Sequence, residues 1–151
     1  MELPNRKVMT IEAAKKAAEA AKADARRNGH RSLIVVVVDP GGHLVYLERG
    51  DGVAWGTIDV AILKAQTAVR FPGPSKKMET ALVEEGMTGL LGLPGVACFE
   101  GAVPLVADDG QLLGAISISG LTKELDGAIA QAGADGLLKL LRSTNEKATP
   151  R

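Results

Sequence analysis

The chain has 151 residues, which fits one domain and is long enough to bury a hydrophobic core. Lys and Arg together number 18, as do Asp and Glu, so the formal net charge is zero, and aromatic residues make up only 3% of the chain. This balance excludes a strongly basic nucleic-acid or membrane-surface binder, and the scarcity of aromatics leaves no stacking platform for bases.

The number of cysteines and the lengths of the apolar segments exclude further classes of protein. Cys98 is the single cysteine, so an intrachain disulfide is impossible, and with two histidines a closed zinc site is not expected. The first residues lack the apolar core of a signal peptide, and no segment approaches the length of a membrane span. We therefore expect a cytoplasmic protein without a bound structural metal.

Helical periodicity predicts four helices with small or aliphatic residues on one face. Pro72 ends the second helix, and Ser75 stands in an N-cap position for the third. The helices are expected over residues 10–29, over 57–70, from Ser75 towards Gly86 or Leu91, and from Glu124 to Leu141.

Runs rich in valine and isoleucine, separated by turn signals, predict five strands. The first two form a hairpin through the turn DPGG, and the last two are joined by DDG. The strands are expected over residues 32–38, 43–48, 96–101, 102–107 and 111–120.

The predicted element order is therefore α-β-β-α-α-β-β-β-α, with a largely antiparallel sheet. VVVV and GAISIS lack polar alternation, so both faces of these strands should be covered and the two should be central neighbours. The resulting strand order is 2-1-5-4-3 with helices on both faces. We predict an α+β, profilin-like, three-layer α/β/α domain over residues 1–142, followed by a flexible tail at 143–151.

Several motifs carry a family resemblance over residues 8–141, nearly the whole chain. In their order and spacing they resemble the GlcG/HbpS family, which includes the carboxy-terminal domain of PduO-type proteins. The resemblance implies a profilin-like αβ fold, homo-oligomers with octamers among them, and haem or corrinoid binding in some members. Other members accompany catabolic enzymes. The motifs are VVVVDPGGHLVYLERGDG, LKAQTAV, GPSKKM, GAVPLV, GAISISG and AQAGADGL.

The resemblance also implies site residues. Ser75 falls where secreted haem-binding members place an iron-ligating threonine, and His30 lies one position from a histidine that other members use. The motif that usually reads Gly-Gly-x-Pro is here Gly101-Ala102-Val103-Pro104, which makes Gly101 and Ala102 candidates for the lining of the pocket. Haem is accordingly the candidate cofactor.

The polar exit of the first hairpin is a second source of candidates. Arg49, Asp51 and Gly52 are interpreted either as a solvated turn or as an anion-binding rim, since Arg can grip a carboxylate with two hydrogen bonds. Trp55, just beyond, is expected to wall a pocket or an interface. Ser75 before Lys76 and Lys77 is explained by capping, but the same helix start can attract an anion.

Two further residues have chemistry that a site could use. Lys64 sits at the margin of the apolar face of its helix; we favour a side chain that reaches solvent, the alternative being a partly buried base or carboxylate anchor. Glu100 is interpreted first as an exposed carboxylate at a strand end and second as an acid or base in the pocket.

Three functions compete on this basis. The first is a small-molecule or cofactor-binding protein, with haem or another tetrapyrrole as ligand, associated with a catabolic pathway. The alternative is a cofactor-independent isomerase, tautomerase or lyase, in which Arg49 holds a carboxylate while Lys64 or Glu100 moves a proton. The third is an accessory homo-oligomer that serves a partner enzyme.

Overall fold

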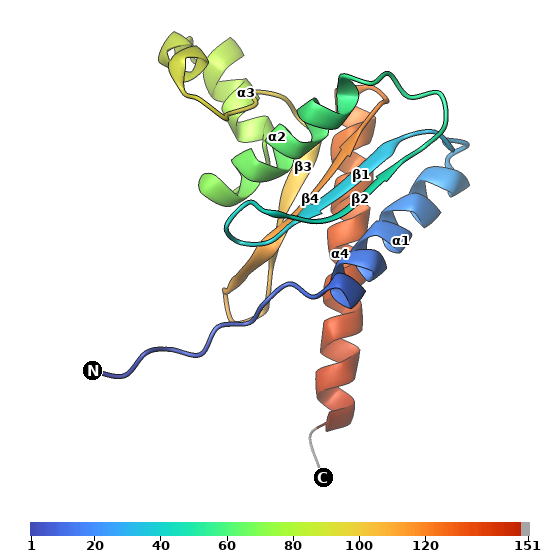
Figure 1. Cartoon of the computed structure of the whole chain (residues 1–151), viewed down its shortest axis with the longest axis vertical. Coiled ribbons are helices and arrows are strands. Elements are labelled where there is room, and N and C mark those ends of the chain that lie inside the picture. Colours follow the sequence, from blue (N-terminus) through green and yellow to red (C-terminus); the bar gives the residue numbers. More distant parts are fainter. Residues whose placement is uncertain (149–151) are drawn as a thin grey trace.

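The computed structural model describes residues 1–148, and residues 149–151 of the predicted tail lie outside that range. The sheet contains β1 (Ile34–Val38), β2 (Leu44–Arg49), β3 (Ala102–Val106) and β4 (Leu112–Ser119). The helices are α1 (Ile11–Arg27), α2 (Thr57–Arg70), α3 (Lys76–Val83) and α4 (Lys123–Ala148), with a 3₁₀ turn η1 (Thr88–Gly92) after α3 (Figure 1).

Within the described residues the sheet is antiparallel and has the order β2-β1-β4-β3. The two apolar strands are central neighbours, as the sequence predicted: Val36 of β1 pairs with Leu47 on one side and Ser117 on the other. Every residue of β1 is buried, because helices cover both of its faces.

The predicted strand at 96–101 is wrong, so the described sheet has four strands and not five. Backbone groups in and beside this stretch bond to side chains of α2 and α3, and the bond to a strand comes at its last residue, where the Gly101 carbonyl accepts from the Ile118 N–H of β4 at 2.8 Å. Arg70 donates to the carbonyl of Gly95 at 2.8 Å, and the Ala97 N–H donates to Thr67 Oγ1 at 2.9 Å. The Glu100 N–H donates to Glu79 at 2.8 Å. Without this strand, the predicted order of the other four is the observed one.

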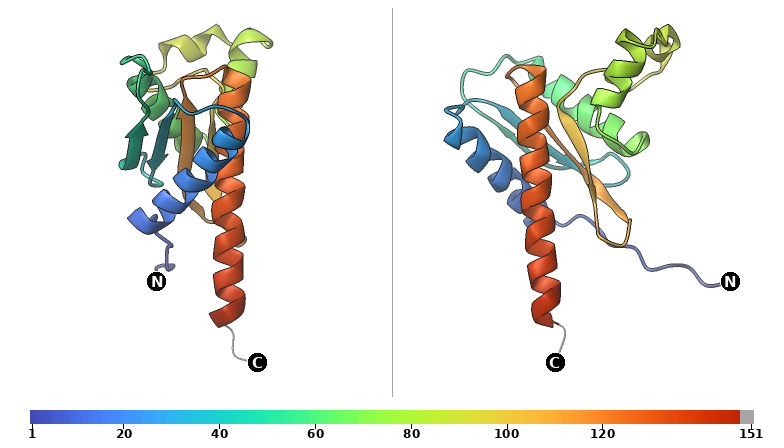
Figure 2. Two further views of the ribbon diagram at one scale, coloured as in Figure 1. Left: turned by 90° about the vertical axis from the view of Figure 1, so that its right-hand side faces the viewer. Right: turned by 180° about the vertical axis from the view of Figure 1, so that it is seen from behind.

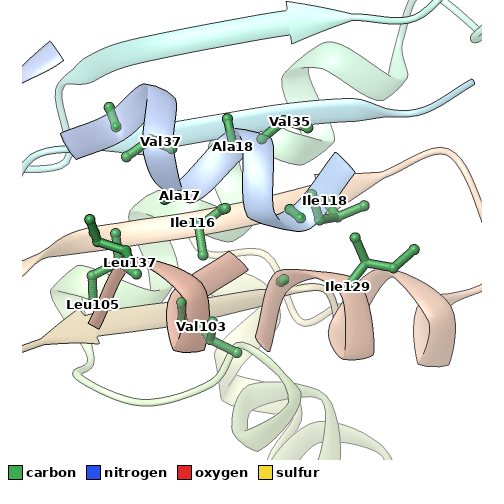
Figure 3. Packing of buried hydrophobic residues seen from close by; sticks show 14 of the residues in the cluster. Ala17, Ala18, Val35, Val37, Val103, Leu105, Ile116, Ile118, Ile129 and Leu137 are labelled. Carbon is green, nitrogen blue, oxygen red and sulfur yellow. The ribbon is translucent and has the colours of Figure 1, made fainter. Parts of the chain in front are cut away.

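Helices form a layer on each face of the sheet (Figure 2). Alternate residues of the two central strands contribute to two cores. Val35, Val37, Ile116 and Ile118 pack under α1 and α4, together with the alanine stripe of α1 (Figure 3). Val36 and Ala115 pack instead against Ala61, Ala65 and Ala68 of α2. These two cores confirm the mixed α and β character predicted from the sequence.

Two segments depart from this compact arrangement. α3 and η1 bury no residue and project from the body of the molecule (Figures 1 and 2). α4 continues to Ala148, so residues 143–148, predicted as part of a flexible tail, are helical. Arg142 contributes to this extension through an ion pair with Asp108 at 2.6 Å. No helix in the part of the chain described here combines the length and the apolar character that crossing a bilayer requires.

Candidate functional site

A cavity of about 470 Å³ opens where β4 ends, between the first residues of α2 and α4. We call it the central cavity. Its walls come from segments far apart in the sequence, namely the start of α2, the loop before β3 and the β4–α4 corner. The lining residues are Ala54, Gly56, Thr57, Val60, Lys64, Phe99, Glu100, Ser119, Gly120, Leu121, Lys123 and Asp126.

Lys64 lies at the inner end of this cavity and is only 2% exposed, so the favoured interpretation of a lysine that reaches solvent is wrong. Its ammonium donates to the carbonyls of Ile118 at 2.6 Å and Glu100 at 3.2 Å, and to Asp126 Oδ2 at 3.2 Å. Three acceptors match the three protons of an ammonium group. Lys64 is thus held as a cation that joins α2, β4 and α4.

Burial shifts the pKa of both Lys64 and Asp126 in the direction that favours the neutral form of each side chain. It lowers the pKa of Lys64 from 10.5, against the opposing attraction of the Asp126 carboxylate. It raises the pKa of Asp126 from 3.8, against the attraction of Lys64 and the N–H of Leu121. The attraction between the two groups opposes the effect of burial on each, and an ammonium at Nζ has one proton for each of its three acceptors.

The loop before β3 fits closely around this ammonium. Gly101 has a φ of +134°, and a Cβ there would overlap Lys64 Nζ and lie 2.9 Å from the Ile118 carbonyl. Glu100 stands at the mouth of the cavity with 14% of its side chain exposed, and it pairs with Lys76 at 3.2 Å. Glu100 is therefore neither at a strand end nor freely solvated.

Ser75 has a different role from the predicted one. It is 1% exposed, and its hydroxyl does not cap α3. Instead it accepts a hydrogen bond from the Ala102 N–H at 3.0 Å, while the Ser75 N–H donates to the Ala102 carbonyl at 2.9 Å. Ser75 and the buried Ala102 thus attach the start of α3 to the start of β3, inside the subunit and away from the cavity lining.

The hairpin exit forms a hollow of its own, about 310 Å³ in volume, which brings together Arg49, Asp51, Gly52 and Trp55. Trp55 is 82% exposed there. This hollow adjoins the central cavity, because Ala54 lines both. A groove beside α3 also adjoins the central cavity, because Glu100 and Lys123 line both. The hairpin exit, Glu100 and the start of α3 thus contribute to three adjoining hollows.

His30 lies elsewhere, in a hollow of about 260 Å³ beyond the end of α1, which we call the His30 hollow. Its apolar floor is made by Ala25, Leu33 and Val35. Lys22, Arg26 and Arg31 surround it, with the single carboxylate of Glu48 and the backbone of Gly50. Lys22 is bonded to Glu48 at 2.8 Å, whereas the guanidinium groups of Arg26 and Arg31 make no hydrogen bond or ion pair with the described residues.

The imidazole of His30 is half-buried, and only the backbone of this residue is bonded, the N–H donating to the Ala25 carbonyl at 2.9 Å. Neither ring nitrogen has a hydrogen-bond partner within residues 1–148, so both remain available to a ligand. No group of three or more His, Cys, Asp or Glu that could hold a metal ion occurs in that same range.

Sequence reasoning did not select Ser119, Lys123 or Asp126 of the central cavity as site residues, although Ser119 lies in the GAISISG motif. Asp126 lies in the first turn of α4, where a carboxylate is common for reasons of helix capping and dipole alone. Ser119 ends a strand that reads as apolar. Nothing in their local patterns connects them with Lys64, which lies more than 50 residues away in the chain.

Comparison with known proteins places the chain among relatives of one kind. Residues 9–135 match the family described as "Haem degrading protein HbpS-like". A stretch of 100 residues is 35% identical to protein GlcG of Escherichia coli K12, covering 66% of this chain and 72% of GlcG.

Solved structures agree with the sequence matches. A double mutant of HbpS from Streptomyces reticuli is 34% identical with a TM-score of 0.76, over 88% of this chain and 89% of that one. ORFY of Klebsiella pneumoniae is 25% identical with a TM-score of 0.81, over 91% of this chain and 96% of that one. The fold described above is thus shared along nearly its whole length.

Proposed function

Because this chain belongs to the HbpS-like family, as its motifs indicated, we propose that it is a cofactor-binding protein that takes haem or a related tetrapyrrole at His30. The observation that carries the proposal is a half-buried imidazole with both nitrogens free, set among three cationic side chains on an apolar floor.

Each part of the His30 hollow matches a part of a haem molecule. Imidazole is a common axial ligand of haem iron. Arg26 and Arg31 can pair with propionate carboxylates, since guanidinium groups bind carboxylates through two parallel hydrogen bonds. Ala25, Leu33 and Val35 offer apolar surface to the edge of a macrocycle. When bound, haem supplies a redox-active iron, and the residues named here hold and orient it.

The hollow is small for this ligand. At about 260 Å³ it lies below the usual range for ligand pockets, so a macrocycle would insert one edge and leave the remainder outside. A second copy of the chain could cover that remainder. Ser75, the other iron ligand that the resemblance suggested, is buried and bonded to Ala102, so we base the proposal on His30.

The chain contains a matched control for this proposal, because His30 and His43 are its two histidines and His43 lies in the exposed β1–β2 turn. Titration of the purified protein with haem should give a Soret band typical of imidazole ligation. We expect His30→Ala to abolish or shift this band and His43→Ala to leave it unchanged. Equal spectra for the wild type and both variants, or no spectral change at micromolar haem, would refute the assignment.

The alternative of proton transfer by Lys64 has less support. The ammonium is almost fully buried and uses all three protons on protein acceptors, so abstracting a proton from a substrate would first require one of these bonds to break. Roles for Arg49 and Glu100 in holding or protonating a carboxylate stay predictions, as do the cytoplasmic location and the association with a catabolic pathway.

We also propose that the chain forms a homo-oligomer. The segment 76–93 runs from α3 through the connecting residues and η1 to Leu93, and none of its residues is buried. Val83, Met87, Leu91 and Leu93 are exposed on it. Contiguous exposed apolar side chains of this kind are typical of protein interfaces. The resemblance described above implies assemblies up to the octamer.

A further inference from the structure

We propose that the central cavity is a second ligand site, independent of haem, and that it binds a small organic monocarboxylate. The hydroxyl of Ser119 and the N-terminal ends of α2 and α4 would hold the carboxylate, and the apolar wall of the cavity would hold the body of the ligand. No residue of this cavity lines the His30 hollow.

Ser119 is the observation that points to a ligand. Its side chain lines the cavity at the last position of β4 and the residue is only 5% exposed, yet its hydroxyl makes no hydrogen bond within the described chain. Among the described residues the fully enclosed side-chain atom without a partner is Ser117 Oγ and not Ser119 Oγ, so the Ser119 hydroxyl still reaches the cavity. It can therefore donate a hydrogen bond to a molecule bound there.

Two helices begin at the same cavity. Gly56 and Thr57 of the α2 start line it, and no side chain caps that helix end. Lys123 and Asp126 bring the first turn of the 26-residue α4 to the opposite wall. Because the positive ends of both helix dipoles face one space, an anion there is favoured over a cation or a neutral molecule.

The acidic side chains at the cavity do not neutralise the positive ends of these helix dipoles, because each acid is paired with a lysine. Asp126 is paired with Lys64, Glu100 with Lys76, and Lys123 with Glu79. Each of these acids is thus matched by a lysine. The N–H groups of Thr57, Ile58 and Val60 are bonded to preceding carbonyls, so the helix starts act through their dipoles. The donor left over is the Ser119 hydroxyl, which together with the two dipoles suits a single negative charge.

The remaining wall favours a carboxylate with an apolar body over a phosphate. Val60, Phe99 and Leu121 line the cavity, and Val60 and Phe99 are 39% and 57% exposed, so they present apolar surface to whatever enters. A volume of about 470 Å³ is within the range of small-molecule pockets. A phosphate dianion would have no guanidinium to meet it, since no arginine lines this cavity.

The test uses haem-free full-length protein labelled with ¹⁵N and titrated with benzoate, isovalerate or inorganic phosphate at millimolar concentration. We expect benzoate and isovalerate to shift the amide signals of Gly56, Thr57, Gly120 and Leu121 in a saturable manner, and phosphate to leave them in place. Failure of all three probes to shift these signals would overturn the proposal, and so would phosphate binding as tightly as benzoate.

Two serines of β4 provide a matched pair of substitutions for a second experiment, in which benzoate binding is compared between variants. Ser117 lies on the same face of the strand as Ser119, has a fully buried hydroxyl without a partner, and does not line the cavity. We expect Ser119→Ala to weaken benzoate binding about fivefold to tenfold and Ser117→Ala to leave it unchanged. Equal effects of the two substitutions would contradict the assignment. Repeating the titration with His30→Ala separates this site from the haem proposal, because benzoate binding should persist in that variant.

Discussion

Lys64 and Asp126 form a buried ion pair, with Nζ 3.2 Å from Oδ2 and side chains only 2% and 5% exposed. The pair joins α2 to the first turn of α4 across the end of the sheet, and the Ile118 and Glu100 carbonyls complete the coordination of the ammonium. The position of the β4–α4 corner, and hence the shape of the central cavity, depends on this contact.

Removing one member of the pair should be far more damaging than removing both. Lys64→Met would leave the Asp126 carboxylate buried without its cation, and we expect it to lower the free energy of unfolding by about 3–5 kcal/mol. Lys64→Met combined with Asp126→Leu should recover part of that loss, because the double variant buries no charge, although the Ile118 and Glu100 carbonyls still lack a donor. Urea denaturation measures both, and a double variant no more stable than the single one would contradict this account.

An exposed pair supplies the control for that series. Lys76 is 61% exposed in its ion pair with Glu100, so Lys76→Met should change stability by less than about 1 kcal/mol.

Gly101 should tolerate no side chain. Its φ of +134° disfavours any other residue, and a Cβ would meet the Lys64 ammonium, the Ile118 carbonyl at 2.9 Å and Asp126 Cβ at 3.0 Å. We therefore expect Gly101→Ala to destabilise the fold by about 2–4 kcal/mol, measured by urea or thermal unfolding. Gly89 has open space around it and no positive φ, so Gly89→Ala is the control and should be nearly neutral.

The features of this fold that could be predicted from the sequence are those that depend on composition and on the spacing of apolar residues. A run of valines without polar alternation indicated a strand covered on both faces, and β1 is fully buried beside β4. The 3.6-residue spacing of α2 gave its bounds at Thr57 and Arg70 without error. Both signals are local, so they can be read before any tertiary contact is known.

The sequence could not predict features that tertiary contacts decide. The stretch 96–101 reads as a strand, but the side chains of Thr67 and Glu79 accept hydrogen bonds from its Ala97 and Glu100 N–H groups. Arg70 bonds the carbonyl of Gly95 directly before it. Lys64 lies at the margin of an apolar face, a place from which a lysine usually reaches water. It is buried here because carbonyls and a carboxylate from positions 36 to 62 residues away surround it.

The same distinction applies to the candidate sites. The family resemblance selected His30, and the polar exit of the first hairpin selected Arg49 and Trp55; all three line hollows. The resemblance also selected Ser75, whose contact with Ala102 depends on where β3 lies relative to α3. Ser119 lies in the GAISISG motif but was not selected as a site residue, because an unpartnered hydroxyl is a property of the packed structure and leaves no pattern in the chain.

Acid should weaken the contact beside the His30 hollow. The Glu48 carboxylate accepts hydrogen bonds from Lys22 at 2.8 Å and from the Tyr46 hydroxyl, and these bonds lower the pKa of Glu48 below its usual 4.5. A lowered carboxylate pKa contributes stability that is present above the unfolded value and is lost as the pH falls through the folded value.

Glu48→Gln should therefore lower the free energy of unfolding at neutral pH by less than about 1 kcal/mol, since the carboxylate is 46% exposed. This difference from the wild type should disappear as the pH falls through the folded pKa of Glu48, which lies below 4.5, because the carboxylate is then protonated in both states. Urea denaturation at neutral pH and at an acidic pH below that folded value checks the prediction. Glu85→Gln, at an exposed carboxylate with no ion pair in the described chain, should show no difference at either pH, and a gap for Glu48→Gln that persists in acid would count against this role.

The exposed apolar segment 76–93 should determine the assembly state. Leu91 is 72% exposed on η1, so burying it against a second copy would remove apolar surface from water, whereas a glutamate there would place a charge in the contact. We expect sedimentation and light scattering to show an oligomer for the wild type and a smaller species for Leu91→Glu. Leu140→Glu, at a 46% exposed leucine on α4, is the control and should keep the wild-type mass. A monomeric wild type, or an oligomer that Leu91→Glu leaves intact while Leu140→Glu dissociates it, would show that this segment is not the interface.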